Sequence, residues 1–489
     1  MSLNLELADL TRLNAIRGAL ESNDARKQFA HLGIGELTIA DSAVDTLIDA
    51  VDRQLTVAGR SAGPRTRLRL IADDVVIMRG GVALKDLVFD RLSERFDVER
   101  VTLNDGHPAL HADEAILDRA SAACAGADCI VSVGGGTITD VAKIAALRVN
   151  AAAHIVVQTA ASVDGFTDNF SVVLQNGVKR TLLTRWPDAV LTDCLTIAEA
   201  PHALNAAGFG ELLSLFSAPG DWLLAARAGM DDSFTPVLVD MLSLCGQDVE
   251  TWSIGVGNGD IEGVRRLASA LAMRGIVTGV GGTTASLSGM EHLISHMLDI
   301  HAAESGAPTG LHGAQVGVAS VIASAAWEVF CERMEETPLD PQRLFGDVDC
   351  WEERVMAAFG TLDPSGRIGA ECWRHYRQKI IRWNGCRDQV EAFFRDWPAV
   401  RAERDAIVLG SHAIATCLHR ARAAKRASEL DPTVSPDLMR WAVAHCQFMR
   451  ERFTIVDLLT FAGWWDEDGV NGVLERAEQA CAAADAGAA

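Results

Sequence analysis

The sequence predicts an α/β domain in its first two hundred residues and an all-helical domain in the remainder. Between residues 67 and 160, short apolar runs alternate with helix-patterned segments, which is typical of a parallel sheet with helices on both faces. From about residue 200 to the end, helical periodicity dominates and is broken mainly by proline and glycine. We therefore expect an α/β domain over residues 1–200 and a helical domain over residues 201–489, extended at its C-terminus.

Each expected element of the α/β domain follows from its own stretch of sequence. After an N-terminal helical region, we expect a strand at 67–73, a helix near 81–96, a strand at 98–105, a helix near 112–125, a strand at 128–133, a helix at 137–148 and a strand at 154–160. The segment 170–192 predicts a β-hairpin around Asn176-Gly177, because Asn-Gly is a preferred pair for a tight turn between strands.

Composition limits the classes of partner. The chain of 489 residues has a formal net charge of −22, which disfavours nucleic acid and anionic lipid surfaces. The first residues show no signal-peptide pattern, and the apolar runs are too short and too interrupted by charge to span a membrane. The eleven cysteines are scattered without a CxxC pair, which favours reduced thiols. We expect a cytoplasmic protein with no membrane insertion and no nucleic-acid partner.

A glycine-rich turn is the first candidate site. In IVSVGGGTITDVAK, residues 130–143, a strand runs into three glycines and then into a helix that begins near Thr137. Residues without a Cβ let the backbone approach a ligand closely, and the N–H groups of a helix N-terminus suit a pyrophosphate. The alternative is an ordinary tight βα turn, since GGG is not the GxGxxG fingerprint.

Polar residues follow the ends of two other expected strands. Asp73 and Asp74 end the first strand, where a carboxylate can bind an adenosine ribose and repel a 2′-phosphate. This favours NAD over NADP, with a solvated turn aspartate as the alternative. The stretch QTAASVDGFTDN, residues 158–169, brings hydroxyls and carboxylates to a second strand end, although polar turn chemistry is the alternative there.

Three histidines lie in EHLISHMLDIH, residues 291–301. His292 and His296 share one helix face, one turn apart, whereas His301 lies about half a turn away. His312 begins a new apolar helix after a Gly/Pro-containing loop. Two imidazoles with Glu211, which starts another apolar helix, would form an open three-ligand shell for a metal. A metal there would act as a Lewis acid on a substrate hydroxyl. The alternatives are core or surface histidines and a glutamate at a helix start.

Together these motifs resemble a known family. GGGTITDVAK is similar to the GGGSxxDxAK element of the iron-containing alcohol dehydrogenase and glycerol dehydrogenase superfamily. TAASVDGFTDN, GVKRT, AAGFGELL, GMEHLISH and LHGAQVG resemble the sn-glycerol-1-phosphate dehydrogenase branch. The resemblance covers about residues 30–320. It implies a dehydroquinate synthase-like fold, with an α/β N-terminal dinucleotide-binding domain and an all-α C-terminal domain that holds a metal.

The resemblance also implies roles for individual residues. The site of the NAD or NADP cofactor would be lined by Asp73, Gly134, Gly135, Gly136, Thr137, Asp140, Thr159, Ser162 and Asp168. One divalent ion, zinc, nickel or iron, would be held by Glu211, His292 and His312. Asp164 and His296 would contact the substrate, with His296 as a candidate proton relay.

The sequence departs from the family pattern at three positions. Glu211 stands where the family usually has Asp, and is one methylene longer. Ala314 replaces an acidic residue of LHGEQVG, and Leu215 stands where a lysine is common. We expect these changes to alter how the substrate sits. Lys179 and Arg180 are candidates for binding a substrate phosphate, with solvated turn charges as the alternative.

The predicted activity is that of a metal-dependent, NAD(P)-linked dehydrogenase. It would interconvert sn-glycerol 1-phosphate, or a similar polyol or polyol phosphate, and dihydroxyacetone phosphate by hydride transfer. Two alternatives are a dehydroquinate-synthase-like lyase, which Glu211 favours, and a catalytically silent binding protein of the same fold. The expected partners are the small polyol phosphate and further copies of the chain in a homo-oligomer.

Overall fold

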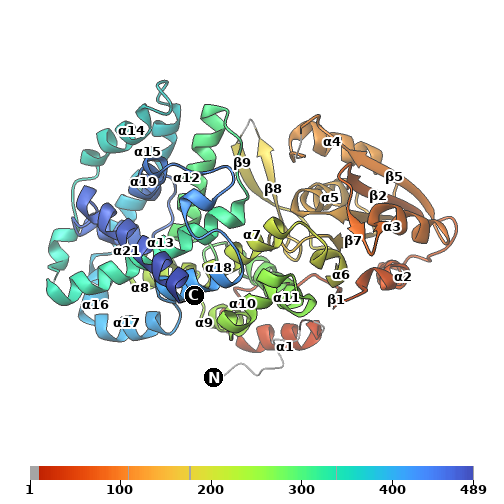
Figure 1. Cartoon of the computed structure of the whole chain (residues 1–489), viewed down its shortest axis with the longest axis horizontal. Coiled ribbons are helices and arrows are strands. Elements are labelled where there is room, and N and C mark those ends of the chain that lie inside the picture. The colour runs from red at the N-terminus through yellow and green to blue at the C-terminus, as the bar shows by residue number, and fades with distance from the viewer. Residues whose placement is uncertain (1–9, 11, 108–109, 176–177, 338, 488–489) are drawn as a thin grey trace. The chain divides into compact units, whose positions relative to one another are not determined.

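A computed structural model of the protein describes residues 10, 12–107, 110–175, 178–337 and 339–487. Contacts divide the chain into two compact units. Unit 1 comprises Met1–Gly208, Asp240–Asp248 and Ile254–Gly282, and unit 2 comprises Phe209–Val239, Val249–Ser253 and Thr283–Ala489. Figure 1 labels the helices and strands of both units.

Unit 1 contains a six-stranded parallel sheet in the order β1-β10-β7-β6-β2-β5. Its strands are β1 (Glu36–Ala40), β2 (Arg67–Asp73), β5 (Asp97–Leu103), β6 (Cys129–Gly134), β7 (Ala153–Gln158) and β10 (Ala189–Asp193). Its helices include α1 (Leu13–Asn23), α2 (Leu47–Val57), α3 (Leu84–Ser93), α4 (Glu114–Ala123), α5 (Gly136–Arg148), α6 (Cys194–Ala198) and α11 (Ile261–Gly281). Two antiparallel pairs lie outside the sheet: β3 (Met78–Arg79) with β4 (Val82–Ala83), and β8 (Phe170–Gln175) with β9 (Val178–Leu183).

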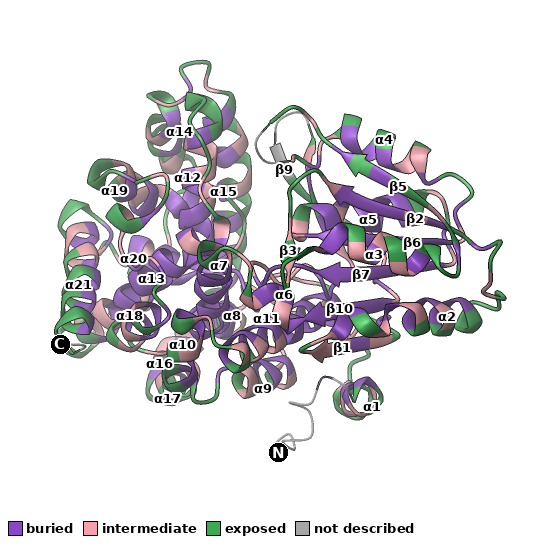
Figure 2. Ribbon diagram, turned by 45° about the vertical axis from the view of Figure 1, so that its right-hand side comes forward, coloured by how far each residue is buried: buried purple, intermediate pink, exposed green. Residues whose placement is uncertain are grey.

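Helices cover both faces of this sheet. Leu68 and Leu70 of β2 pack in one apolar cluster with α2 and α3, whereas Ile71 packs in the other with α4 and α5. Successive strand residues point to opposite faces, so a strand covered on both faces is apolar at nearly every position. Figure 2 shows β6 and β7 buried along their whole length.

The predicted α/β class is confirmed, and the predicted elements between residues 67 and 160 all form. The hairpin is shorter than predicted, because its second strand ends at Leu183 and residues 189–193 form β10 of the main sheet instead. The predicted turn at Asn176-Gly177 lies outside the described residues. Strands β1 and β10 were not predicted separately, because each offers only five residues of pattern.

Unit 2 is built from helices. Within it lie α8 (Ala218–Arg227), α12 (Met290–Ser305), α13 (His312–Glu336), α14 (Glu352–Gly360), α15 (Arg367–Gly385), α16 (Arg387–Arg395), α17 (Trp397–Asp405), α18 (Ser411–Arg420), α19 (Pro436–His445), α20 (Ile455–Phe461) and α21 (Glu467–Ala486). Helices α7 (His202–Leu213), α9 (Pro236–Cys245) and α10 (Val249–Asn258) have residues in both units.

One helix among the described residues, α13, is long and apolar enough to cross a membrane by length and composition alone. Of its most apolar window, 83% is buried inside the protein. The core helices of folded proteins pass the same test.

Candidate metal centre and dinucleotide site

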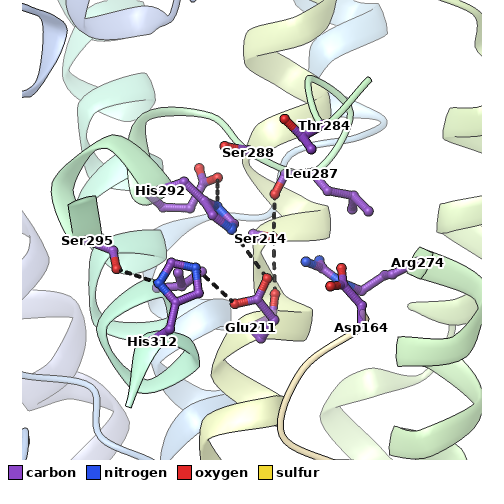
Figure 3. Close-up of polar contacts among 12 residues, drawn as sticks. Asp164, Glu211, Ser214, Arg274, Thr284, Leu287, Ser288, His292, Ser295 and His312 are labelled. Atoms are coloured by element: carbon purple, nitrogen blue, oxygen red, sulfur yellow. Dashed lines mark hydrogen bonds and ion pairs between the residues drawn. The ribbon is translucent and has the colours of Figure 1, made fainter. Parts of the chain in front are cut away.

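Helices α12 and α13 of unit 2 and the part of α7 that belongs to the same unit bring one carboxylate and two imidazoles together. Glu211 lies in the last turn of α7, and not at a helix start as predicted, because the helix begins at His202. His292 is the third residue of α12, and His312 is the first residue of α13. The Nε2 atom of His292 lies 3.3 Å from Oε1 of Glu211, and Nε2 of His312 lies 3.8 Å from Oε2. One ligand atom from each residue lies within 4.8 Å of the others. Figure 3 shows both rings turned toward the carboxylate.

Helices α7 and α13 approach closely because glycines face each other there. A Cβ on Gly210 would lie 2.3 Å from the carbonyl oxygen of Gly313, and a Cβ on Gly317 would lie 2.8 Å from Cα of Gly210. Both distances are shorter than real side-chain carbons allow. Gly210 and Gly313 adjoin Glu211 and His312 in sequence, so the glycine contact brings two of the three donor residues together.

The three donors fit a divalent cation. Glu211 and His292 are only 4% and 6% exposed, and two imidazole nitrogens with one carboxylate oxygen form a shell known from zinc sites that keep an open position. Burial lowers the pKa of His292, but the carboxylates of Glu211 and Glu291 outweigh burial and raise it to about 9. The surroundings of His292 therefore favour a positive charge, which either a proton or a metal ion supplies.

The two other histidines of this helix have different neighbours. The ring of His296 stacks on that of His312, with centroids 5.6 Å apart and planes inclined by 23°. The ring of His301 lies 6.0 Å from that of Trp441. The structure thus groups His296, and not His301, with the metal donors, as the helical spacing predicts. Contact of His296 with substrate stays a prediction.

In unit 1, the carboxyl ends of β2 and β6 lie side by side where the strand order reverses. From β2 the chain passes through α3 to β5 on one side, and from β6 it passes through α5 to β7 on the other. Open α/β sheets bind ligands at such a point. The register pairs Ile71 with Ser132, so Asp73 and Gly134 end neighbouring strands at the same level.

The glycine turn at this point is packed on two sides and open between them. A Cβ on Gly134 would lie 2.7 Å from Ile138, and one on Gly136 would lie 2.9 Å from Val163, whereas a Cβ on Gly135 would meet no heavy atom within 4 Å. Helix α5 begins at Gly136, and Thr137 in its first turn is exposed. An open backbone turn before a helix N-terminus fits a pyrophosphate.

Asp73, the predicted ribose ligand, has a basic partner. The Nζ atom of Lys85 forms an ion pair with its carboxylate, and donates hydrogen bonds of 2.8 Å to the carbonyl oxygen of Asp73 and 2.6 Å to that of Val75. The side chain of Asp73 is 18% exposed and that of Lys85 is 11% exposed. Lys85 therefore offsets the carboxylate charge while the carboxylate keeps some access to solvent.

Asp168, another predicted cofactor residue, lies against a buried lysine. Lys143 donates from Nζ to Oδ1 of Asp168 at 2.6 Å and to the carbonyl oxygens of Gly165 and Phe170 at 2.5 and 2.8 Å. These bonds tie the loop after β7 to helix α5. Asp168 is 6% exposed, and its contact with Lys143 holds the loop in place. Contact of Asp168 with the cofactor stays a prediction.

The remaining predicted residues of unit 1 lie on the same loop or on α5. Burial raises the pKa of Asp140 to about 7 against the opposing charge of Lys143, and its carboxylate accepts a hydrogen bond from the backbone of Val172. Thr159 is buried and Ser162 is half-buried. Their proposed contacts with cofactor stay predictions.

Asp164, predicted to touch substrate, faces Arg274 (Figure 3). Nε of Arg274 on α11 donates to Oδ2 of Asp164 at 3.2 Å, and the arginine side chain is fully buried while that of Asp164 is 23% exposed. The arginine holds the orientation of this carboxylate, whose role toward substrate stays a prediction.

Reasoning from sequence missed the charged partners of these residues. Lys143 lies one helical turn after Asp140, so helical spacing could have indicated that partner, whereas adjacent helix residues such as Glu291 and His292 do not normally face each other. Lys85 and Arg274 are separated from their partners by 12 and 110 residues. Nothing in the local pattern indicates contacts of that kind.

Comparison with known proteins first shows which class of protein shares this fold. The family described as iron-containing alcohol dehydrogenase matches residues 54–201. Among solved structures, maleylacetate reductase from Agrobacterium tumefaciens is similar with a TM-score of 0.55 and 16% identity, covering 92% of this chain and 97% of that one. An iron-containing alcohol dehydrogenase from Thermococcus thioreducens is similar with a TM-score of 0.52 and 14% identity, covering 92% and 99%. These likenesses show a shared fold and confirm the predicted fold class.

Curated proteins of similar sequence define the family of this chain more narrowly. The glycerol-1-phosphate dehydrogenase (NAD(P)+) of Halalkalibacterium halodurans is 31% identical over 279 residues, 56% of this chain and 68% of that protein. That of Pyrococcus furiosus is 33% identical over 210 residues, 42% and 58%. The chain thus belongs to the iron-containing alcohol dehydrogenase family, in the branch of the glycerol-1-phosphate dehydrogenases, as its motifs predict. It covers between 53% and 68% of the length of the curated relatives compared.

Proposed function

We propose that this protein is a metal-dependent, NAD(P)-linked dehydrogenase that interconverts sn-glycerol 1-phosphate, or a similar polyol phosphate, and dihydroxyacetone phosphate. The observation that carries the proposal is the cluster of Glu211, His292 and His312 in a chain of this family. The names of the curated relatives support the substrate and the use of NAD or NADP.

The metal donors have distinct tasks in this proposal. A divalent ion, when bound, supplies Lewis acidity toward the reacting oxygen of the substrate. Glu211 contributes the negative charge of the shell, and His292 and His312 contribute neutral nitrogens. His296, stacked beside His312, would hold or release the proton of the substrate hydroxyl.

The dinucleotide residues act by binding and orientation. Bound NAD or NADP supplies the hydride chemistry at its nicotinamide. The open turn at Gly135 and the N-terminus of α5 would hold the pyrophosphate, and Asp73 would accept a hydrogen bond from the adenosine ribose. Further contacts would come from Gly134, Gly136, Thr137, Asp140, Thr159, Ser162 and Asp168.

The positions at which this sequence departs from the family pattern affect which substrate we expect. Leu215 is buried at 3% exposure, so an apolar side chain fills a place where a lysine is common in the family. Arg180 is exposed and is the candidate for a phosphate contact, while the side chain of Lys179 lies outside the described residues. Loss of one basic group favours a substrate with less negative charge, and dihydroxyacetone, the ketone of a nonphosphorylated polyol, is therefore part of the test.

The test is a parallel assay of wild-type protein and His292→Ala. Oxidation of NADH and NADPH is followed with dihydroxyacetone phosphate, with dihydroxyacetone and with the substrate of dehydroquinate synthase. We expect turnover with dihydroxyacetone phosphate that His292→Ala abolishes. Phosphate release from the synthase substrate without oxidation of NADH would replace the proposal by a lyase. Metal binding without turnover of any substrate would leave a binding protein of this fold.

A further inference from the structure

Each metal-donor imidazole has a hydrogen-bond partner at Nδ1, the ring nitrogen that does not face Glu211. Nδ1 of His312 lies 3.0 Å from Oγ of Ser295, whose hydroxyl donates to Gln315, so the serine oxygen accepts the Nδ1 proton. Nδ1 of His292 lies 2.9 Å from Oε1 of Glu291. Both arrangements fix a ring proton on Nδ1, so that Nε2, which faces Glu211 in each ring, is the nitrogen that would bind a metal. Outer partners of this kind orient histidine ligands and raise their basicity.

Glu291 is itself held rigidly. Its side chain is fully buried, Oε1 accepts a 2.6 Å hydrogen bond from the backbone N–H of Gly289, and Oε2 accepts a 2.9 Å bond from the hydroxyl of Ser217. A carboxylate with both oxygens engaged in a buried position has one orientation. The ring of His292 therefore takes its direction from a group that cannot turn.

The start of α12, which carries both residues, is tied to the C-terminal region. Asp221 on α8 is 2% exposed. Its Oδ2 accepts from the backbone N–H of Met290 at 2.9 Å, and its Oδ1 accepts from that of Ile455 at 3.0 Å. One carboxylate thus satisfies an N-terminal N–H group of α12 and one of α20.

A half-buried arginine, Arg452, makes a second connection between the same two regions. Arg452, three residues before α20, donates to the hydroxyl of Thr284 at 2.7 Å and to the carbonyl oxygen of Ser288, both in the loop that leads into α12. The segment that carries Arg452 is fixed in turn, because Asp457 on α20 pairs with the fully buried Lys379 at 2.8 Å.

We propose that Glu291 is a positioning residue for the metal ligand His292, and that the segment 452–457 of the C-terminal region holds the loop and helix start on which Glu291 lies. The proposal rests on the metal site of the proposed function. It assigns a role to part of residues 330–489, a region in which the sequence offers no recognised motif. The segment contributes no ligand, and acts on the metal through the geometry of α12.

Cobalt(II) binding tests this proposal apart from activity. Metal affinity is measured by competition with a chelator, and ligand geometry by the visible absorption spectrum of the bound ion. We expect Glu291→Gln to weaken Co²⁺ binding roughly 10- to 100-fold, the usual cost of losing an outer partner of a histidine ligand, and to change the spectrum. Arg452→Met should weaken binding by less. Glu328→Gln, on α13, and Arg476→Met, on α21, are the matched controls and should keep both affinity and spectrum.

A second variant guards against misfolding. Ser217→Ala removes one hydrogen bond from Glu291 and leaves its charge, so a folded protein with intermediate affinity is expected. Wild-type affinity and spectrum in Glu291→Gln, or in Ser217→Ala if Glu291→Gln does not fold, would overturn the proposal. Wild-type protein that binds Co²⁺ through His292 but turns over no substrate would refute the proposed function alone. Wild-type protein that binds no Co²⁺ would refute both.

Discussion

Glu211 reaches both imidazoles although it is longer than the aspartate usual at this position in the family. Its oxygens lie 3.3 and 3.8 Å from Nε2 of His292 and of His312. We predict that Glu211→Gln, which keeps the shape but removes the charge, weakens metal binding by more than the roughly 10- to 100-fold cost of an outer-shell change. Titration of apoprotein with zinc measures this effect, and Glu304→Gln, at the exposed end of α12, is the control. Full zinc affinity in Glu211→Gln would remove the glutamate from the shell.

Lys85 bears on the choice of dinucleotide. An isolated carboxylate at Asp73 would repel the 2′-phosphate of NADP, but the ammonium of Lys85 offsets that charge. We predict that Lys85→Met raises the ratio of NADH affinity to NADPH affinity roughly 10-fold, corresponding to about 1.4 kcal/mol. Quenching of tryptophan fluorescence by each dinucleotide measures binding without turnover. Arg91→Met on the same helix is the control, and an unchanged ratio in Lys85→Met would disprove the prediction.

Asp140 makes stability depend on pH. Burial raises its pKa in the folded protein to about 7 from an ordinary value of 3.8, so the folded state binds more protons than the unfolded state between these values. The protonated Asp140 side chain therefore contributes to the free energy of unfolding below about pH 4, and this contribution is lost as the pH rises through about 7. Asp140→Asn keeps an acceptor for Val172 and cannot ionise. We predict that this variant gains stability relative to wild type between about pH 5 and about pH 8, by a few kcal/mol at most, since one pKa unit is about 1.4 kcal/mol. Urea unfolding at both pH values tests this, and a difference that does not grow with pH would contradict it.

At the scale of elements, the contact between α7 and α13 depends on glycine. A Cβ on Gly210 would lie 2.3 Å from the carbonyl oxygen of Gly313, so Gly210→Ala must push the helices apart. We predict a loss of about 1–3 kcal/mol of stability together with weaker metal binding, because Glu211 and His312 adjoin the contact.

Gly472 in the second turn of α21 provides a matched control, since a Cβ there would meet no heavy atom within 4 Å. Gly472→Ala should be neutral or stabilising by up to about 1 kcal/mol, because alanine favours the helix. Thermal unfolding and zinc titration of both variants distinguish a local steric effect from a general effect of alanine. Equal behaviour of the two variants would show that the glycine contact does not position the metal donors.

Elements with strong local patterns were predictable from sequence, and contacts between elements were not. Strand β2 forms at the predicted residues 67–73, because its four buried residues, Leu68, Leu70, Ile71 and Ala72, are all apolar and its flanks are polar. The pairing of His292 with His296 on one helix face follows from the helical period. By contrast, the approach of Glu211 to His292 joins residues 81 positions apart and depends on how two helices cross. The family motif, and not spacing, indicated that contact beforehand.

At the scale of the whole molecule, the candidate ligand sites belong to different units. The metal donors Glu211, His292 and His312 all lie in unit 2, whereas the dinucleotide residues lie in unit 1. The two units are not continuous in sequence, since residues 240–248 and 254–282 belong to unit 1 although the helical pattern after residue 200 continues through them. Each ligand should therefore stabilise a different set of segments.

Hydrogen–deuterium exchange can separate these sets. We predict that zinc protects the amides of α12 and the first turns of α13, and that NADH without zinc protects the turn 134–140, because a ligand suppresses the local opening of the segments that it contacts. A ligand at about 100 times its Kd stabilises the bound state by about 2.7 kcal/mol. This is enough to slow amide exchange roughly 100-fold in segments whose local opening destroys the binding site. His292→Ala should lose the zinc effect and keep the NADH effect. Protection of the turn 134–140 by zinc alone, with none in α12, would place the metal outside the predicted shell.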